Sequence, residues 1–312
     1  MTSGPVVFLM GPTACGKTAA ACRLADEFDA EIISVDSALV YRGLDIGTAK
    51  PSPIVLGRYP HHLINLRDPG ERYSAAQFRR DARAAIAAVQ RRGRLPLLVG
   101  GTGLYFRVLR DGIAQLPEAD PGVRDRLASE LTSNGLPALY ARLAAVDPPS
   151  AQRIHPHDRQ RTLRALEVYE TTGAPMSEML ARNAEPGLET APLQLVLAPA
   201  NRDWLHQRIA ARLDVMLRAG FVNEVRALRA RGDLGPEDPA LRTVGYRAVW
   251  QYLDGELTYA TMRERATVAT RQLAKRQFTW FRGVSGAHWV DPREPDPIAR
   301  LRVEIMRHIE VN

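Results

Sequence analysis

The sequence is 312 residues long, 45% hydrophobic and 25% charged, and it carries a formal net charge of +7. This length and apolar content suffice for one sizeable core and a smaller second domain, so they exclude a small fold that depends on disulfides or metal ions. The excess of 42 basic over 35 acidic residues suggests a polyanionic partner, although an arginine-rich composition alone also produces it.

The first predicted elements form a strand, a loop, a helix and a second strand. Residues 6–10 are a short apolar run that predicts a buried strand, and Gly11 then begins a turn. From Lys17 onward the apolar residues recur at helical spacing, which predicts an amphipathic helix. A second apolar run, residues 32–35, predicts another buried strand that ends at Asp36.

The following segments continue this alternation. Ser74 and Gln77 have the spacing of a capping box, which predicts a helix that ends near Gly93. Residues 95–99 predict a buried strand, and residues 100–103 predict a sharp turn into a further helix. Alternating strands and helices indicate a mostly parallel sheet covered on both faces.

Between residues 113 and 191 the strand signal disappears, and prolines separate polar helices, so we predict a helical insertion. Residues 193–197 predict a last strand, after which only helices are expected. The expected domains are therefore a core made of residues 1–115 and 191–312, with a helical C-terminal region, and an insertion made of residues 116–190.

Residues 11–18 match the P-loop pattern of a glycine, four residues and then Gly-Lys-Thr, between a predicted strand and a predicted helix. In such a loop, backbone N–H groups bind an anion, the lysine neutralises the terminal phosphate and the threonine holds Mg²⁺. The motif predicts an α/β fold of the P-loop NTPase type, and an ordinary tight turn before a helix is the weaker alternative. It does not say whether the phosphate belongs to a nucleotide or to another diphosphate. Its residues are Gly11, Pro12, Thr13, Ala14, Cys15, Gly16, Lys17 and Thr18.

Asp36 ends the second predicted strand, so in a parallel sheet we expect its carboxylate beside the P-loop. It is a candidate general base, and a turn or helix cap is the alternative. Thr102 leaves the strand at 95–99 beside the same crevice, where it is expected to bind the acceptor or the base, or else to cap a helix. Asp45 and Asp68 are competing acids, but both lie in turn-like sequences, so turn formation is their expected role.

The remaining reactive side chains predict no further site. Two histidine doublets, at 61–62 and 155–157, have no cysteine or carboxylate at metal-ligand spacing, so we expect surface or core histidines. Cys15 and Cys22 suit neither a disulfide framework nor a zinc site, which favours a reducing, cytoplasmic setting. The sequence shows no signal-like leader and no apolar run of membrane-spanning length, so no membrane association is expected, and a monomer is the default.

Near the C-terminus, five basic residues occur without an intervening acid and are interleaved with aromatic residues. They are Arg265, Arg271, Lys275, Arg276 and Arg282, with Phe278, Trp280 and Phe281. Basic groups bind phosphates and aromatic rings stack on unpaired bases, so this segment predicts RNA binding. The alternative is a helix with aromatic residues in the core and solvated arginines. A second basic cluster at 159–164 precedes two glutamates and by itself predicts only a solvated face.

Several segments together resemble the tRNA dimethylallyltransferase (tRNA isopentenyltransferase) family. They are the P-loop, the block Asp-Ser-Ala-Leu-Val-Tyr-Arg-Gly-Leu-Asp-Ile-Gly-Thr-Ala-Lys-Pro at 36–51, and the segments 100–105, 164–169, 244–247 and 270–277, in family order. The block at 36–51 is far more specific than the P-loop. Leu39 stands where glutamine is common and Asn65 where aspartate is expected. The chain has no zinc-finger extension like that of eukaryotic relatives, which favours the bacterial type.

The resemblance implies transfer of a dimethylallyl group from dimethylallyl diphosphate to N6 of the adenosine beside the anticodon, position 37 of tRNA. It implies that the P-loop and Lys17 hold the pyrophosphate, with Mg²⁺ on Thr18. Asp36 would take the proton from N6, and Thr102 would help to position the base. Arg208 matches an arginine that steadies the departing pyrophosphate, although Arg212 lies one turn away.

The same resemblance implies which residues contact tRNA. They are Asp36, Ser37, Ala38, Leu39, Thr102, Arg124, Gln160, Arg161, Thr162, Leu163, Arg164, Arg242, Thr243, Val244, Gly245, Tyr246, Arg247, Lys275, Arg276, Gln277, Phe278, Thr279, Trp280, Phe281 and Arg282. A small-molecule or nucleotide kinase is the strongest rival, because kinases share the P-loop and an acid after the second strand. An RNA-binding protein with an unused P-loop is a third possibility. The basic, aromatic C-terminal segment and the long insertion favour the transferase.

Overall fold

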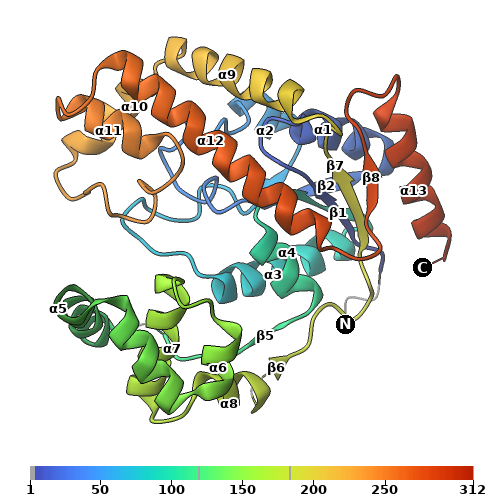
Figure 1. Ribbon diagram of the computed structural model, residues 1–312. Coiled ribbons are helices and arrows are strands. Elements are labelled where there is room, and N and C mark those ends of the chain that lie inside the picture. The colour runs from blue at the N-terminus through green and yellow to red at the C-terminus, as the bar shows by residue number, and fades with distance from the viewer. Residues whose placement is uncertain (1–3, 119, 183, 312) are drawn as a thin grey trace. The chain divides into compact units, whose positions relative to one another are not determined.

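The computed structural model describes residues 4–118, 120–182 and 184–311. Within them, six strands form one sheet in the order β3-β2-β4-β1-β7-β8, and every strand pair in it is parallel (Figure 1). These strands are β1 (Val7–Met10), β2 (Ala30–Val35), β3 (His61–His62), β4 (Leu95–Gly100), β7 (Leu193–Leu197) and β8 (His288–Val290). The predicted α/β class with a parallel sheet is therefore confirmed.

The chain divides into two compact units. One consists of Met1–Arg110 with Leu188–Asn312 and contains the six-stranded sheet; we call it the P-loop unit. The other consists of Asp111–Gly187, and we call it the helical unit.

Helices cover both faces of the sheet in the P-loop unit (Figure 1). On one face, α1 (Lys17–Phe28) packs against α13 (Pro297–Val311). On the other face, α3 (Ala75–Arg91) packs against α4 (Gly103–Arg110). The predicted capping box begins α3, because the Ser74 hydroxyl accepts the Gln77 N–H while the Gln77 side chain accepts the Ser74 N–H.

Four helices lie between β7 and β8 in sequence: α9 (Arg202–Arg218), α10 (Phe221–Ala230), α11 (Tyr246–Leu253) and α12 (Tyr259–Arg282). They share a core with the segment after β2, in which Val40, Leu44, Phe221 and Tyr246 are buried. This packing joins residues 40–46 to helices that lie almost two hundred positions later. The packing therefore holds in place part of the block at 36–51, which is the most specific part of the family resemblance.

The prediction that only helices follow residue 197 was wrong, because β8 returns the chain to the sheet beside β7. This strand has three residues, and His288 and Trp289 are exposed, so it shows no apolar run. The two-residue strand β3 and the short helix α2 (Pro53–Arg58), which buries none of its residues, were also missed, because each is too short for a periodic pattern.

The helical unit contains α5 (Pro121–Val146), α6 (Pro148–Arg153), α7 (Arg159–Thr172) and α8 (Met176–Arg182). Among the described residues of this unit, the only strands are β5 (Ile113–Ala114) and β6 (Ala184–Glu185). Each has two residues, and the two strands pair antiparallel. Helix α5 bends at Gly135, whose φ of 76° suits glycine, two residues before a proline. In the core of the helical unit, α5 packs against α7 through buried residues such as Leu139, Leu143 and Leu166.

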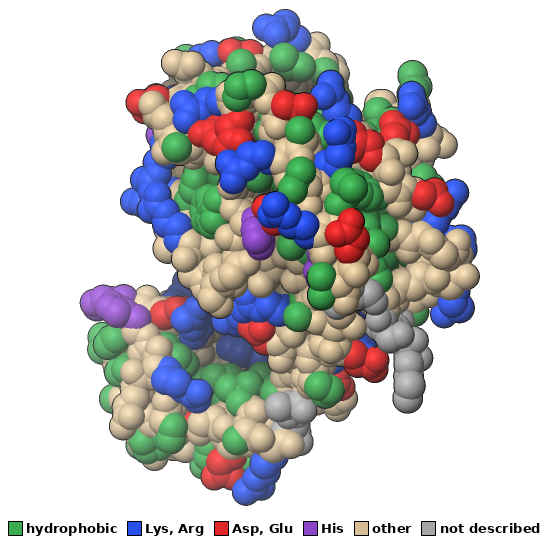
Figure 2. Space-filling view, turned by 90° about the vertical axis from the view of Figure 1, so that its right-hand side faces the viewer, with side chains coloured by type: hydrophobic (Ala, Val, Ile, Leu, Met, Phe, Trp, Pro, Cys, Tyr) green, Lys and Arg blue, Asp and Glu red, His purple; other side chains and the backbone are tan. Residues whose placement is uncertain are grey.

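Basic and acidic side chains are mixed on one face of the molecule. Figure 2 shows Lys and Arg side chains lying among Asp and Glu side chains there. Exposed ion pairs such as Arg263 with Asp214 and Arg302 with Glu27 are typical, and each contributes little to stability. No helix among the described residues is long and apolar enough to cross a membrane.

A buried carboxylate stabilises the sheet. Glu31 on β2 has a side chain that is only 4% exposed, and Arg92 donates to it from Nε at 2.8 Å and from Nη2 at 2.6 Å. His62 Nε2 lies 2.6 Å from the same carboxylate. The Arg92 hydrogen bonds, with a smaller contribution from His62, lower the pKa of Glu31 to about 2.

We expect Glu31→Gln to lower the free energy of unfolding by roughly 2–3 kcal/mol near neutral pH. A lowered pKa stabilises the folded state above the pKa of the unfolded chain, near 4.3, and this contribution is lost as the pH falls towards 2. The difference between wild type and variant should therefore shrink between pH 5 and pH 2. Urea unfolding across this range measures it, with the exposed Glu310→Gln as the control. A difference that does not change with pH would contradict the assignment.

Candidate active site

A large hollow of the P-loop unit lies at the carboxyl edge of the sheet, as expected for ligand sites of parallel α/β folds. It has a volume of about 1130 Å³ and is lined by the loops that follow β1, β2 and β4 together with α9 and α12. Strand β4 lies between β1 and β2. The loop after β4 therefore lies between the P-loop and Asp36.

The P-loop connects β1 to α1. Gly16, at the N-cap of α1, has a φ of 102° and gives no side-chain cap, so the first N–H groups of α1 stay available for an anion. Gly11 has no room for a side chain, because a Cβ there would lie 2.3 Å from the Leu197 carbonyl oxygen. Lys17 Nζ donates to the carbonyl oxygens of Gly11 at 2.8 Å and Pro12 at 2.7 Å. Lys17 therefore folds back over the first two residues of the loop, and the phosphate-binding role stays a prediction.

Asp36 directly follows β2 and is half-buried in the wall of the cavity. Its Oδ1 accepts the Ala38 N–H at 2.8 Å, which is the turn contact weighed as the alternative to catalysis. Among the described residues, no hydrogen bond to Oδ2 is found, so this oxygen is free to accept a proton from a ligand. The two interpretations of Asp36 are compatible.

Thr102 links the loop after β4 to the loop after β2. Its Oγ1 accepts the Ser37 N–H at 3.1 Å, and its own N–H donates to the Val35 carbonyl oxygen at 3.2 Å. Thr102 precedes α4, but its hydroxyl contacts Ser37 instead of capping that helix. The hydroxyl proton remains available to a ligand in the cavity.

Arg208 and Arg212 both line the cavity from α9, one turn apart. Arg208 Nε donates to the Ala14 carbonyl oxygen at 2.8 Å, and its guanidinium lies 4.7 Å from the Trp204 ring centroid. Arg212 Nη2 donates to the Thr48 carbonyl oxygen at 3.1 Å. Burial lowers the pKa of Arg212, and the nearby Asp36 carboxylate opposes that shift. Both arginines therefore lie where a diphosphate on the P-loop would need positive charge.

The cavity also has an apolar wall. Ile209, Leu213 and Met216 follow one another on α9 at helical spacing, and Phe221 begins α10 beside them. Sequence periodicity predicts the α9 residues only as a buried stripe. Their place beside the arginines gives the cavity a charged end and an apolar surface, which suits a ligand with both characters.

Glu224 on α10 holds the loop that closes one side of the cavity, a contact that the sequence does not predict. Its Oε2 accepts the N–H groups of Asp45 at 2.9 Å and Ile46 at 2.6 Å, and its Oε1 accepts the N–H of Gly47 at 3.0 Å and the Tyr246 hydroxyl at 2.6 Å. The carbonyl oxygen of Thr48, in the same loop, accepts a hydrogen bond from Arg212. The carboxylate therefore fixes the loop on which Arg212 rests.

Asp45 and Asp68, the competing acids, both have structural contacts. Lys50 is buried and donates to Asp45 Oδ1 and Asn65 Oδ1, both at 2.6 Å, so Asp45 and the unusual Asn65 share one cation. Asp68 Oδ1 accepts the Gly70 N–H at 3.1 Å. Turn formation, the role predicted for Asp68, is confirmed, and Asp45 likewise has a structural contact.

The residues predicted to contact tRNA fall into several environments. Those in the cavity wall are Asp36, Ser37, Ala38, Leu39, Thr102, Arg242, Thr243, Val244, Gly245, Arg276, Gln277 and Trp280. Exposed members of the P-loop unit include Arg247, Lys275, Thr279 and Arg282. Tyr246, Phe278 and Phe281 are buried, so their side chains pack in the core, which is the alternative considered for the aromatic residues. A nucleic acid can therefore contact the exposed residues of these segments but not the three buried rings.

The remaining predicted tRNA contacts belong to the helical unit. Arg124 on α5 and Arg164 on α7 both form ion pairs with the buried Glu167, at 2.6 and 2.9 Å. Thr162 is buried and Leu163 packs against the core of this unit, whereas Gln160 and Arg161 are exposed. The exposed pair begins α7, where a nucleic acid can reach it.

The histidines and cysteines form no second reactive centre in the described part of the chain. No group of three or more potential metal ligands occurs there. His62 pairs with Glu31, and the rings of His155 and His157 lie 5.4 Å apart. Cys15 and Cys22 are both free thiols.

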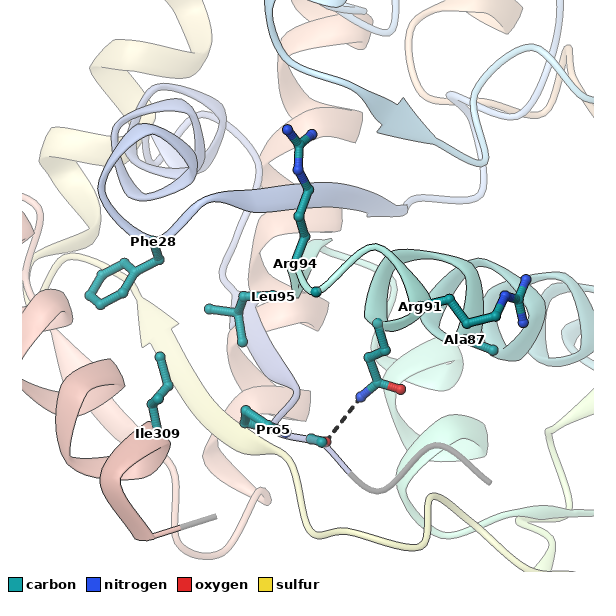
Figure 3. Close-up of a pocket in the computed structure, with 10 residues that line it drawn as sticks. Pro5, Phe28, Ala87, Arg91, Arg94, Leu95 and Ile309 are labelled. Carbon is teal, nitrogen blue, oxygen red and sulfur yellow. Dashed lines mark hydrogen bonds between the residues drawn. The ribbon is translucent and has the colours of Figure 1, made fainter.

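A second hollow, of about 610 Å³, lies at the opposite edge of the sheet, where β1 and β4 begin. Figure 3 shows Pro5, Phe28, Leu95 and Ile309 around it. Its lining mixes apolar side chains with Gln90, Arg91 and Arg94, and parallel sheets of this type bind their ligands at the carboxyl edge instead. The cavity beside the P-loop is therefore the candidate active site.

Comparison with known proteins identifies the family. Residues 39–284 match the family model described as IPP transferase. The chain belongs to this family. It is an enzyme of the transferase class, and the resemblance inferred from the sequence motifs is confirmed.

Members of the IPP transferase family with high identity cover almost all of this chain. The tRNA dimethylallyltransferase of Halorhodospira halophila (strain DSM 244 / SL1) is 58% identical over 281 residues, which are 90% of this chain and 91% of that protein. The tRNA dimethylallyltransferase of Thioalkalivibrio sulfidiphilus (strain HL-EbGR7) is 54% identical over 306 residues, which are 97% of this chain and 96% of that protein.

Solved structures of the IPP transferase family share the fold. The tRNA isopentenylpyrophosphate transferase from Bacillus halodurans is 35% identical and has a TM-score of 0.71, with 99% of this chain and 97% of that chain covered. A eukaryotic dimethylallyltransferase acting on tRNA is 28% identical and has a TM-score of 0.82, with 99% of this chain and 80% of that chain covered.

Proposed function

We propose that this cavity transfers a dimethylallyl group from dimethylallyl diphosphate to N6 of adenosine 37 of tRNA, releasing pyrophosphate. The names of the relatives, tRNA dimethylallyltransferase, support the reaction. The observation that carries the assignment is the position of the P-loop and Asp36 in the wall of one cavity, with the loop of Thr102 between them. A donor and an acceptor can then meet in the space that the three loops enclose.

On the donor side, the diphosphate lies on the N–H groups of the P-loop. Lys17, Arg208 and Arg212 provide positive charge around it, and the side chains of Ile209, Leu213 and Met216 provide an apolar surface for the five-carbon chain. Negative charge grows on the pyrophosphate as the carbon–oxygen bond breaks, so these cations stabilise the transition state more than the ground state.

Mg²⁺ fits the donor side, because Thr18 lines the cavity at the start of α1, and hydroxyl and diphosphate oxygens are hard ligands. Thr18 and the diphosphate would hold the ion. When bound, it would neutralise charge on the leaving group. Lys17 and the two arginines supply the remaining positive charge from the chain itself.

On the acceptor side, Asp36 Oδ2 takes one proton from N6 while N6 forms a bond to the allylic carbon and the pyrophosphate leaves with the bonding electrons. An exocyclic amine is a weak nucleophile, so a positioned base contributes about 10²–10⁴ in rate. Thr102 can orient the purine from the neighbouring loop. A base in an unpaired RNA loop is easier to extrude than one in a duplex, which favours the anticodon loop as substrate.

The same proposal assigns the polyanionic partner suggested by the net charge. Arg242, Arg276 and the exposed basic residues of α12 would bind tRNA phosphates, and Gln160 and Arg161 would bind from the helical unit. We further propose that the enzyme acts as a monomer in the cytoplasm, where its two free thiols remain reduced.

The test is an assay of the purified protein with unmodified tRNA, Mg²⁺ and radiolabelled dimethylallyl diphosphate. We expect one prenylated adenosine per substrate tRNA, at position 37, and a release of pyrophosphate that requires both substrates. ATP in place of the prenyl donor should give neither product. Phosphate transfer from ATP without a modified adenosine would contradict the proposal and favour a kinase.

A further inference from the structure

Gln277 on α12 bridges two loops of the cavity with the two ends of one amide. Its Oε1 accepts the Thr13 N–H of the P-loop at 2.9 Å. Its Nε2 donates to the Gly101 carbonyl oxygen, in the loop after β4, at 3.1 Å. These partners lie 264 and 176 positions away in the sequence, so the side chain forms a long-range connection.

The two loops approach each other closely where Gln277 binds them. A Cβ at Gly101 would lie 2.3 Å from Gln277 Nε2 and 3.3 Å from the Gly11 carbonyl oxygen. A Cβ at Gly103 would lie 2.2 Å from the Trp280 ring, one helical turn further along α12. The glycines therefore let α12 pack directly on this loop, and the amide is held against both of its partners.

The connection continues to the acceptor side. Gly101 is followed by Thr102, whose Oγ1 accepts the Ser37 N–H next to Asp36. An unbroken series of contacts therefore runs from Thr13 through Gln277, Gly101 and Thr102 to Ser37. It joins the donor cradle to the proposed general base by hydrogen bonds and two peptide units.

We propose that Gln277 is a positioning residue, which holds the P-loop and the Thr102 loop at the spacing that prenyl transfer requires. This inference rests on the proposed function. It differs from the role in tRNA contact suggested by sequence, because both ends of the amide bind the protein itself. A neutral amide suits the position, since one partner is a donor and the other an acceptor. An ionised carboxylate would face the Gly101 carbonyl oxygen without a proton to donate.

The first experiment compares Gln277→Ala with Gln272→Ala, an exposed glutamine on the same helix. Because the loops lose their connection, Gln277→Ala should lower kcat/KM for dimethylallyl diphosphate by about ten- to a hundredfold. Its affinity for inorganic pyrophosphate should fall as well, while the Kd for tRNA stays within about twofold of wild type. Gln272→Ala should match wild type in all three measurements, and thermal unfolding shows whether each variant is folded.

The second experiment uses Gln277→Glu, which keeps the shape but can donate to Gly101 only when it is protonated. Its activity relative to wild type should rise as the pH is lowered from 8 to 5.5, whereas the ratio for Gln277→Ala should stay flat. This readout does not depend on the alanine variant being fully stable, and a merely structural role would not produce it.

The outcomes separate failure of the positioning role from failure of the proposed function. Loss of tRNA affinity with unchanged pyrophosphate affinity would overturn the positioning role and assign Gln277 to tRNA binding. Activity of Gln277→Ala equal to that of Gln272→Ala would also overturn it. A wild-type enzyme that fails to prenylate tRNA would instead refute the proposed function, before any variant is compared.

Discussion

Asp36→Asn should leave tRNA binding almost unchanged and lower kcat for prenyl transfer by about 10²–10⁴, the contribution expected of a general base. The substitution keeps the side-chain oxygen that accepts the Ala38 N–H, so the turn after β2 should persist. It removes the basicity of the second oxygen, which has no partner among the described residues. Single-turnover prenylation and tRNA binding, measured on the same preparation, separate the two effects.

Comparison with Asp36→Ala makes the test decisive. If Asp36 served only to shape the turn, Asn would preserve activity and Ala would abolish it. If Asp36 is the base, both variants should be inactive, and only Ala should also change the turn. An active Asn variant would therefore disprove the proposed role of Asp36 in catalysis.

Lys17→Met should reduce kcat/KM for dimethylallyl diphosphate by about 10²–10³, a loss typical of removing one preorganised group that stabilises transition-state charge. Methionine keeps most of the aliphatic stem but cannot donate to the Gly11 and Pro12 carbonyl oxygens or to a diphosphate. The affinity for pyrophosphate, measured by calorimetry, should fall together with the rate.

The matched control for Lys17→Met is Arg23→Met, which removes one positive charge from an exposed position of the same helix. We expect this control to bind pyrophosphate as wild type does. Equal losses in both variants would mean that the net charge of α1, and not the position of Lys17, governs donor binding.

The sequence predicts those parts of the structure whose signals are local. The strands at 6–10 and 95–99 are apolar runs, the capping box at Ser74 has a fixed spacing, and the P-loop is one contiguous motif. Asp36 could be assigned to the carboxyl edge of the sheet, because the carboxyl ends of parallel strands all lie at that edge. The resemblance to relatives then implied the chemistry, and the family comparison confirmed the family.

The missed features depend on residues that are distant in sequence. Glu224 lies 179 positions from Asp45, whose N–H it accepts, and a glutamate inside an amphipathic helix gives no sign of such a partner. Gln277 was expected to contact tRNA because the family resemblance implies it, and only the packing of α12 reveals the two hydrogen bonds that its amide makes. Strand β8 is too short, and too exposed, to produce an apolar pattern.

The strand order also sets the distance between the ends of β1 and β2. Strands with one neighbour interposed are separated by about 9–10 Å, twice the usual interstrand spacing, whereas adjacent strands are separated by half of that. Because β4 is interposed between β1 and β2, the proposed leaving group and the proposed proton acceptor are kept apart by that larger interval. Moving the acid to the end of β4 would halve the interval, so the isoprenoid and the purine edge would compete for the same volume.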